Sequence, residues 1–364
     1  MVNVVLAGGG TAGHTSPLIA TAEQIRALDP EATLTAIGTP KGLESRVIPA
    51  AGLDLKMISP VPMPRKPSAE LAMVPMKLRK AINEAKDVLT RADADVLVGF
   101  GGYVSMPAYF AARSLKLPIV VHEQNALPGL ANKVAAKFTD QVYVSFPDTP
   151  LKGGIYIGLP VRRTIAELDR ASLRAEARKH FDLDPDKPTL LVSGGSQGAA
   201  SINKAVKGAK DRLTAEGIQI LHVLGQKNFT EDMFSETNEE TGAAYLPVAY
   251  VEKMELAYAA ADLMLGRSGA GTVVETAVIG LPTIFVPFPH GNGEQAKNAE
   301  ALVAAGGARL VEDSACTADW LLAEVPGMLA DTGGLQAMSR ASSNTVPGNA
   351  AEVLARRVLD IAKR

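Results

Sequence analysis

Short runs of β-branched and aliphatic residues alternate with longer stretches of mixed apolar and polar residues along the whole chain. In the first half the runs are 2–7, 33–37, 96–98, 119–122, 141–144 and 155–157, and in the second half they are 189–193, 218–223, 243–248, 263–266 and 283–286. Strands that alternate with helices predict parallel sheets covered on both faces. The pattern therefore predicts an α/β protein.

Both halves begin in the same way, with a strand, a Gly-Gly loop and a helix. We expect one Rossmann-like domain over residues 1–160 and a second over 161–345, followed by an amphipathic helix near 349–363 within a final segment 346–364. A chain of 364 residues is long enough for two cores. Two such domains facing each other would form an inter-domain cleft, with ligands at the carboxyl ends of the strands.

Composition and charge exclude several classes of protein. The formal net charge is −2, which gives no general attraction to nucleic acid. Cys316 is the only cysteine, so neither a disulfide framework nor a cysteine metal site is possible. The start of the chain does not read as a secretion signal, and no run reaches the roughly 18 apolar residues that span a bilayer. We expect a cytosolic protein whose membrane contact is peripheral.

Four glycine-rich loops follow predicted strands, at 8–13, 99–102, 194–198 and 266–271. Glycine lets the backbone turn sharply and approach a ligand, and the helix that follows offers free N–H groups to an anion. Each loop alone is equally consistent with a simple strand-to-helix turn. The four together predict phosphate groups bound by both domains.

The first loop fits the dinucleotide fingerprint Gly-x-Gly-x-x-Gly at 8–13. An NAD site would also need an acidic residue at the end of the second strand, and that strand ends in Gly38-Thr39. We therefore disfavour an NAD-dependent oxidoreductase. The loop leads into His14, which would serve as a general base if its pKa lay near neutral. A helix-capping or phosphate-binding histidine is an equal alternative.

Three further polar segments follow strands. Ser268–Ala270 enters a helix and would bind a diphosphate, and Glu275, further along that helix, suits the two hydroxyls of a ribose. The loop 287–295 carries amide and carboxylate groups suited to sugar hydroxyls. The cluster His122-Glu-Gln-Asn125 places four hydrogen-bonding side chains at the end of a strand. No spacing of His, Asp and Glu indicates a zinc or calcium site.

These motifs, in this order and over essentially the whole chain, resemble the MurG family, the UDP-N-acetylglucosamine:N-acetylmuramyl-(pentapeptide) pyrophosphoryl-undecaprenol N-acetylglucosamine transferases. The motifs that carry the resemblance are 9–14, 101–105, 122–125, 194–199 and 267–270. The resemblance implies the GT-B glycosyltransferase fold, with the final helix crossing back to the first domain. It also implies transfer of N-acetylglucosamine from the UDP-sugar to lipid I, which yields lipid II for peptidoglycan synthesis, with no cofactor and no essential metal.

The resemblance assigns site residues at the matching positions. The donor residues would be Thr11, Ala12, Gly13, Asn125, Arg162, Ser196, Val251, Ala270, Gly271, Thr272, Glu275 and Gln295. The acceptor residues would be Gly101, Gly102 and Tyr103, and the loop 11–13 would join them in receiving the acceptor diphosphate. Two positions depart from the family pattern. Glu294 stands where many members have Gln, and Ala12 stands where glycine is common.

The expected reaction inverts the anomeric carbon and forms a bond to the C4 hydroxyl of N-acetylmuramic acid. His14 is the candidate base and Glu123 is its rival. Helix N-termini at Ser196 and Ser268 would stabilise the departing UDP in place of a metal. The alternatives are transfer to another lipid acceptor, a UDP-N-acetylglucosamine epimerase and a non-catalytic UDP-sugar sensor.

A membrane surface is predicted over residues 62–86, where apolar residues such as Leu71, Met73, Val74, Met76 and Leu78 lie among basic ones. This composition suits anionic lipid, although an ordinary amphipathic helix would look similar. We expect a peripheral protein at the cytoplasmic face of the plasma membrane. Its partners would be UDP-N-acetylglucosamine, lipid I, anionic lipid and proteins of cell-wall synthesis and division, but not nucleic acid.

Overall fold

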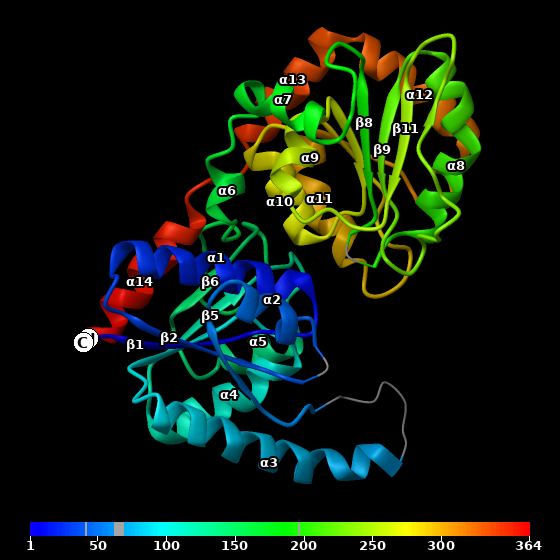
Figure 1. The fold of residues 1–364 in the computed structure, drawn as a ribbon. Helices are drawn as coiled ribbons and strands as arrows, with labels where there is room; N and C mark the ends of the chain where they lie inside the picture. The colour runs from blue at the N-terminus through cyan, green and yellow to red at the C-terminus, as the bar shows by residue number, and fades with distance from the viewer. Residues whose placement is uncertain (41, 62–68, 196) are drawn as a thin grey trace. The chain divides into compact units, whose positions relative to one another are not determined.

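The computed structural model describes residues 1–40, 42–61, 69–195 and 197–364 (Figure 1). The side chains of residues 12 and 69–72 are outside this description, as are Ser196 and the segment 62–68 of the predicted membrane surface. The chain divides into two compact units. The first comprises Met1–Arg163 together with Pro347–Arg364, and the second comprises Thr164–Val346. Each unit contains one seven-stranded sheet.

The first unit has a parallel sheet in the order β3-β2-β1-β4-β5-β6-β7. Its strands are β1 Asn3–Ala7, β2 Thr33–Gly38, β3 Asp54–Met57, β4 Val96–Gly99, β5 Ile119–Glu123, β6 Val142–Val144 and β7 Gly154–Tyr156. Its helices are α1 Ala12–Leu28, α2 Glu44–Ala50, α3 Ala69–Arg91, α4 Gly102–Leu115, α5 Leu130–Ala135 and α14 Ala350–Ala362.

Successive residues of the central strands point to opposite faces of this sheet, and each face has its own core. Val5 and Ala7 belong to the cluster that contains residues of α3, α4 and α5. Val4 and Leu6 belong to the cluster that contains residues of α1, α2 and α14. The strands are therefore apolar throughout, as expected for a parallel sheet buried on both faces.

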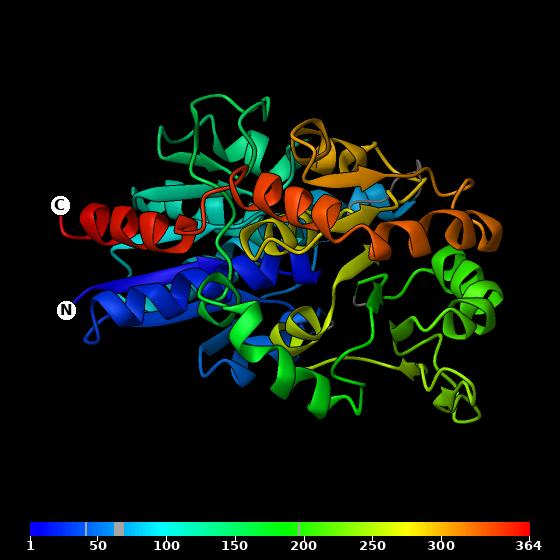
Figure 2. The same cartoon turned by 90° about the horizontal axis from the view of Figure 1, so that it is seen from above.

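The last helix completes the first unit. Leu354, Ala355 and Val358 of α14 are fully buried in the same cluster as Leu18 and Ile25 of α1. Figure 2 shows α14 beside α1, with both chain ends at one end of this unit. The amphipathic pattern at the end of the chain thus reflects a helix that packs onto the first sheet.

The second unit has the sheet order β10-β11-β9-β8-β12-β13-β14, in which only β10 is antiparallel to its neighbour. Its strands are β8 Thr189–Ser193, β9 Gln219–Val223, β10 Glu236–Thr237, β11 Ala244–Val248, β12 Leu263–Gly266, β13 Thr283–Phe285 and β14 Ala308–Leu310. Its helices are α7 Arg170–His180, α8 Ala200–Ala215, α9 Met254–Ala260, α10 Ala270–Val278, α11 Glu294–Ala304, α12 Ala318–Ala330 and α13 Thr332–Ser343. The short helix α6, Arg163–Ala166, precedes them.

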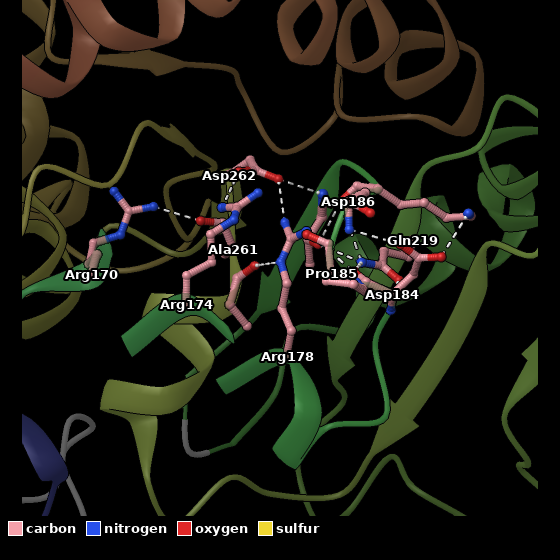
Figure 3. Close-up of polar contacts among 12 residues, drawn as sticks. Arg170, Arg174, Arg178, Asp184, Pro185, Asp186, Gln219, Ala261 and Asp262 are labelled. Atoms are coloured by element: carbon pink, nitrogen blue, oxygen red, sulfur yellow. Dashed lines mark hydrogen bonds and ion pairs between the residues drawn. The ribbon is translucent and has the colours of Figure 1, made fainter. Parts of the chain in front are cut away.

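A cluster of charged side chains connects α7 to the amino ends of strands β8 and β12 (Figure 3). Asp262, directly before β12, accepts hydrogen bonds from Arg174 at 2.6 Å and from Arg178 at 2.9 Å. The Asp262 carboxylate also accepts from the Thr189 amide at 2.9 Å, and the Arg178 side chain is only 1% exposed. Arg170 instead donates to three backbone carbonyls, those of Tyr258, Ala261 and Gly280. One carboxylate and several carbonyls therefore compensate three buried or half-buried guanidinium groups.

All the predicted strands are present, and the α/β prediction is confirmed. The sequence pattern missed β3, β10 and β14, which lie at the edges of the sheets and are short or polar. Helix α1 starts at Ala12, within the first glycine-rich segment. Pro17 lies inside the helix, where it lacks the N–H that would bond to the Gly13 carbonyl.

Candidate active site

Both sheets reverse their strand order at a single place, and the glycine loops leave from there. In the first sheet β1 is flanked by β2 and β4, with Ala7 paired to Gly99. In the second sheet β8 is flanked by β9 and β12, with Ser193 paired to Gly266. Parallel α/β sheets bind ligands outside the carboxyl ends of the strands at such a reversal. Each unit therefore has two glycine loops that start side by side at its expected ligand site.

The two loops of the first unit pack directly against each other. Gly102 has φ +79°, and a Cβ atom there would lie 2.6 Å from the Gly9 carbonyl oxygen. Helix α1 begins after Thr11 and helix α4 after Gly101, and neither has a side-chain hydrogen bond capping its N-terminus. Two uncapped helix N-termini side by side favour an anion, since their N–H groups and partial positive charges converge.

His14 lies in the first turn of α1, next to these loops. Its Nδ1 is 2.9 Å from Thr11 Oγ1, and the ring lies near Gly101, where a Cβ would be 3.4 Å from His14 Cδ2. Burial lowers the pKa of His14 to about 4, while the charge of Glu44 opposes this shift. The neutral ring is therefore the resting form at neutral pH, as a proton acceptor requires.

Glu44 is a site residue that the sequence analysis missed. It is the first residue of α2, completely buried, and its carboxylate accepts the Gly10 amide at 2.8 Å. The same carboxylate accepts the amide of Thr39 at 3.0 Å and its hydroxyl at 2.7 Å. Glu44 lies six residues after the end of β2, beyond the strand end where the dinucleotide fingerprint has its acidic residue. This carboxylate holds the first glycine loop, and β2 itself ends at Gly38 without an acidic residue, so NAD binding stays disfavoured.

Most side chains of the polar cluster at 122–125 are buried and bond to other groups of the first unit. His122 is buried, its Nε2 lies 2.9 Å from the Gly158 carbonyl, and burial lowers its pKa to about 4. The Glu123 carboxylate, also buried, accepts from the amides of Asn125 at 3.0 Å and Gly129 at 2.9 Å and from the Asn132 side chain at 2.9 Å. Burial raises the pKa of Glu123. These contacts shape the loop after β5. Asn125 is half-buried and is the most accessible of the four residues in the cluster.

Other predicted residues of the first unit differ in exposure. Tyr103, the second residue of α4, is 54% exposed. Thr11 and Gly13 are also exposed. Arg162 is half-buried, and its Nε is a buried donor without a hydrogen-bond partner among the described residues.

In the second unit, a buried network holds the glycine loop after β8. Gly198 has φ +71°, and a Cβ there would lie 2.0 Å from the Leu224 carbonyl oxygen. That carbonyl accepts the Asn203 side chain at 3.0 Å, and Asn203 Oδ1 lies 3.1 Å from His222 Nε2. Helix α8 begins after Ala199, whose side chain has no polar group to cap the helix N-terminus. The predicted Ser196 belongs to this loop but is outside the described residues.

The loop after β12 leads into α10, which begins at Ala270 without a side-chain cap. The Ser268 side chain is fully buried, so it points into the protein and not toward solvent. Gly271, Thr272 and Glu275 are half-buried. Tyr258, a second residue that the sequence analysis missed, donates its hydroxyl to Glu275 Oε2 at 2.8 Å. This bond orients the carboxylate predicted to hold the ribose.

The loop after β13 is closed by one of the predicted residues. Gln295 Oε1 accepts the Phe288 amide at 2.9 Å, so the amide nitrogen of Gln295 is the group available for a sugar hydroxyl. The Glu294 amide donates to Asn292 Oδ1 at 3.2 Å. Val251 is 6% exposed, so only its backbone suits the predicted contact with uracil.

Within the described part of the chain, no group of three or more His, Cys, Asp or Glu side chains is arranged to hold a metal ion. No helix there is long and apolar enough to cross a membrane. On α3, Val74 and Leu78 pack against the core, whereas Met73 is 46% exposed and Met76 63%. The apolar part of the predicted membrane surface on this helix is therefore smaller than the sequence suggested, and Leu71 lies outside the described side chains.

The chain matches family models along most of its length. Residues 4–144 match the glycosyltransferase family 28 N-terminal domain, and residues 189–355 match its C-terminal domain. A UDP-N-acetylglucosamine–N-acetylmuramyl-(pentapeptide) pyrophosphoryl-undecaprenol N-acetylglucosamine transferase from Nocardioides sp. is 53% identical over 360 residues, which cover 99% of this chain and 98% of the relative. A protein of the same description from Cutibacterium acnes is 56% identical over 368 residues, which cover 100% and 98%.

Solved structures show the same fold. MurG from Acinetobacter baumannii has a TM-score of 0.72 and 26% identity, and the match covers 99% of this chain and 100% of that one. A calicheamicin glycosyltransferase has a TM-score of 0.66 at 15% identity, with full coverage of this chain and 99% of that one, which shows likeness of fold alone.

Proposed function

Since the chain belongs to glycosyltransferase family 28, we propose that it transfers N-acetylglucosamine from UDP-N-acetylglucosamine to N-acetylmuramyl-(pentapeptide) pyrophosphoryl-undecaprenol, so that lipid I becomes lipid II. The observation that carries this proposal is the pair of glycine loops at the strand reversal of each unit. Both substrates contain a diphosphate, and each unit offers two uncapped helix N-termini suited to one.

The second unit supplies the donor site in this proposal. The N-termini of α8 and α10 would bind the UDP diphosphate, and Glu275, oriented by Tyr258, would accept the ribose hydroxyls. The Val251 backbone would contact uracil, and the Gln295 amide nitrogen would donate to the sugar. As UDP departs, the helix N-termini would stabilise the developing charge. The assignment of Asn125 and Arg162 to the donor continues to rest on the family resemblance.

The first unit supplies the acceptor site and the base. The N-termini of α1 and α4, which include Gly13, Gly102 and Tyr103, would bind the acceptor diphosphate. His14 would take the proton of the C4 hydroxyl as that oxygen attacks the anomeric carbon and UDP leaves from the opposite side. Glu123 suits this task less well, because three donors already occupy its carboxylate.

The hydrogen bond to Thr11 decides which nitrogen of His14 is basic. If Nδ1–H donates to Thr11 Oγ1, Nε2 carries the free lone pair and is the proton acceptor. Thr11→Val removes the acceptor for Nδ1–H while it preserves side-chain shape. We expect kcat to fall about tenfold with little change in the KM for the UDP-sugar.

Membrane contact is part of the proposal because the acceptor carries a long prenyl chain. Met73 and Met76 on α3 are exposed, and Arg79 and Lys80 follow them on the surface. We propose that residues 73–80, in the amino-terminal half of α3, contact anionic lipid at the cytoplasmic face of the membrane. A variant with Arg79 and Lys80 changed to Glu should bind anionic vesicles more weakly. Unchanged binding would remove this assignment.

The primary test is UDP release from UDP-N-acetylglucosamine in the presence of EDTA, with and without a short-chain lipid I analogue. We expect release only with the analogue, formation of a disaccharide-lipid, and loss of both in His14→Ala and Glu275→Ala. Release without acceptor would indicate an epimerase or hydrolase instead. Near-normal turnover of His14→Ala would eliminate it as the base.

A further inference from the structure

The first glycine loop is built around the side chain of Glu44. A Cβ atom added to Gly9 would lie 2.6 Å from Glu44 Cδ, and one added to Gly42 would lie 2.0 Å from Glu44 Oε2. A Cβ at Gly38 would lie 2.6 Å from Glu44 Cγ. Three glycines from three segments therefore leave the space that this carboxylate occupies, so its position follows from the local sequence.

A buried carboxylate is costly unless its charge is compensated. Three donors reach Glu44, namely the amides of Gly10 and Thr39 and the Thr39 hydroxyl. Among the described residues no Lys or Arg forms an ion pair with it. The charge that it does influence is that of His14, four residues after Gly10. An apolar side chain would leave the Gly10 and Thr39 donors without this acceptor, so the carboxylate holds the loop, and its charge acts on His14 as well.

We propose that Glu44 is a positioning residue for the proton transfer: it fixes the His14-bearing loop through the Gly10 amide, and its negative charge stabilises the His14 imidazolium that forms when the acceptor hydroxyl loses its proton. The proton moves from the C4 hydroxyl to His14, and Glu44 neither accepts nor donates it. This inference rests on the proposed role of His14 as base.

The charges around His14 determine the expected direction. Burial and the positive end of α1 both disfavour the imidazolium. The facing start of α4 presents Gly101 to the ring, with the neutral Asn132 behind it. Within the described part of the chain, Glu44 is the one ionisable side chain recorded as acting on His14, and it raises the pKa. Removal of its charge should therefore lower the pKa of His14 and make it a weaker base.

The experiment measures kcat against pH for Glu44→Gln, with the UDP-sugar and the short-chain acceptor analogue both saturating. The acid limb of this profile reports the base in the substrate complex. We expect the limb to move to lower pH and the plateau of kcat to fall about tenfold, with the KM for the UDP-sugar within twofold of wild type.

Two matched variants separate charge from folding. Thr39→Val removes one hydrogen bond to the carboxylate but keeps its charge, so its acid limb should coincide with that of wild type. Glu44→Asp keeps the charge one methylene further from Gly10 and should give an intermediate limb. If Glu44→Gln does not fold, Glu44→Asp still tests the inference, with Thr39→Val as its control. Identical limbs in wild type and in the folded Glu44 variants overturn the inference.

The proposed base and this inference fail in different ways. Near-normal turnover of His14→Ala removes the base, and the role of Glu44 falls with it. An inactive His14→Ala protein combined with an unshifted acid limb in Glu44→Gln leaves His14 as the base and shows that Glu44 only holds the fold.

Discussion

Replacement of Asp262 by alanine should destabilise the second unit strongly. The substitution leaves Arg178, whose side chain is 1% exposed, with a charge that is no longer paired, and it removes the acceptor of the Thr189 amide. Removal of one partner of a buried ion pair costs about 3–5 kcal/mol. The Asp262 side chain is 21% exposed, so solvent relieves part of this cost. We therefore expect a loss of about 3 kcal/mol, at the lower end of that range.

Two control proteins test this reasoning. Glu324→Ala breaks the Arg309–Glu324 pair, which has a similar distance of 2.7 Å in the same unit but side chains that are 52% and 39% exposed. Its cost should be about 0–1 kcal/mol. Replacing Asp262 by Leu and Arg178 by Met together removes both charges, and this protein should be more stable than Asp262→Ala.

The assay is equilibrium unfolding in urea, followed by tryptophan fluorescence. Trp320 is the only tryptophan, and it lies on α12 of the second unit, so its signal reports on the unit that contains the substitution. A loss for Asp262→Ala no larger than that of Glu324→Ala would refute the argument from burial, since the two pairs would then be energetically equivalent.

Three further predictions concern other sites. His122 should contribute roughly 1.4 kcal/mol per pH unit to the fall in the free energy of unfolding as pH drops from 6.5 toward 4, because the unfolded chain protonates this ring at a higher pH than the folded one does, and His14 and His222, whose pKa values burial also lowers, add to the total slope; an unchanged slope in His122→Asn would contradict this. Tyr258→Phe should raise the KM for the UDP-sugar about three- to tenfold in steady-state assays, and an unchanged KM would argue against the Glu275 contact. Gly102→Ala should destabilise the first unit by at least about 1–2 kcal/mol in urea unfolding, more than Gly153→Ala, which shares a positive φ but has open space around it.

The sequence predicted the central strands and the glycine loops because both depend on local chemistry. Apolar β-branched runs such as Val4–Leu6 can only be buried strands here, and glycine is required where Gly102 and Gly198 take positive φ against a neighbouring carbonyl. The polar edge strand β3 has no such signature, because its outer side faces solvent.

The contacts that position the candidate groups depend on distant parts of the chain and left no local pattern. Glu44 bonds to Gly10 across 34 residues, and Tyr258 reaches Glu275 from a different helix. The cluster at His122–Asn125 suggested four ligand-binding side chains, yet three of them are buried within the unit. A sequence shows which residues can do chemistry, whereas burial decides which of them meet a substrate.

The contribution of α14 to the first core has a consequence for how the protein is made. Residues 347–364 belong to the first unit, although the whole second unit, Thr164–Val346, lies between them and the rest of it. During synthesis the apolar face of α1 lacks its partners until Leu354 and Val358 of α14, which follow the second unit, have been translated. The second unit, continuous in sequence, is free to fold earlier. The unit that is translated first is thus the last to complete its fold. Until α14 has been translated, the uncovered apolar face of α1 can promote aggregation.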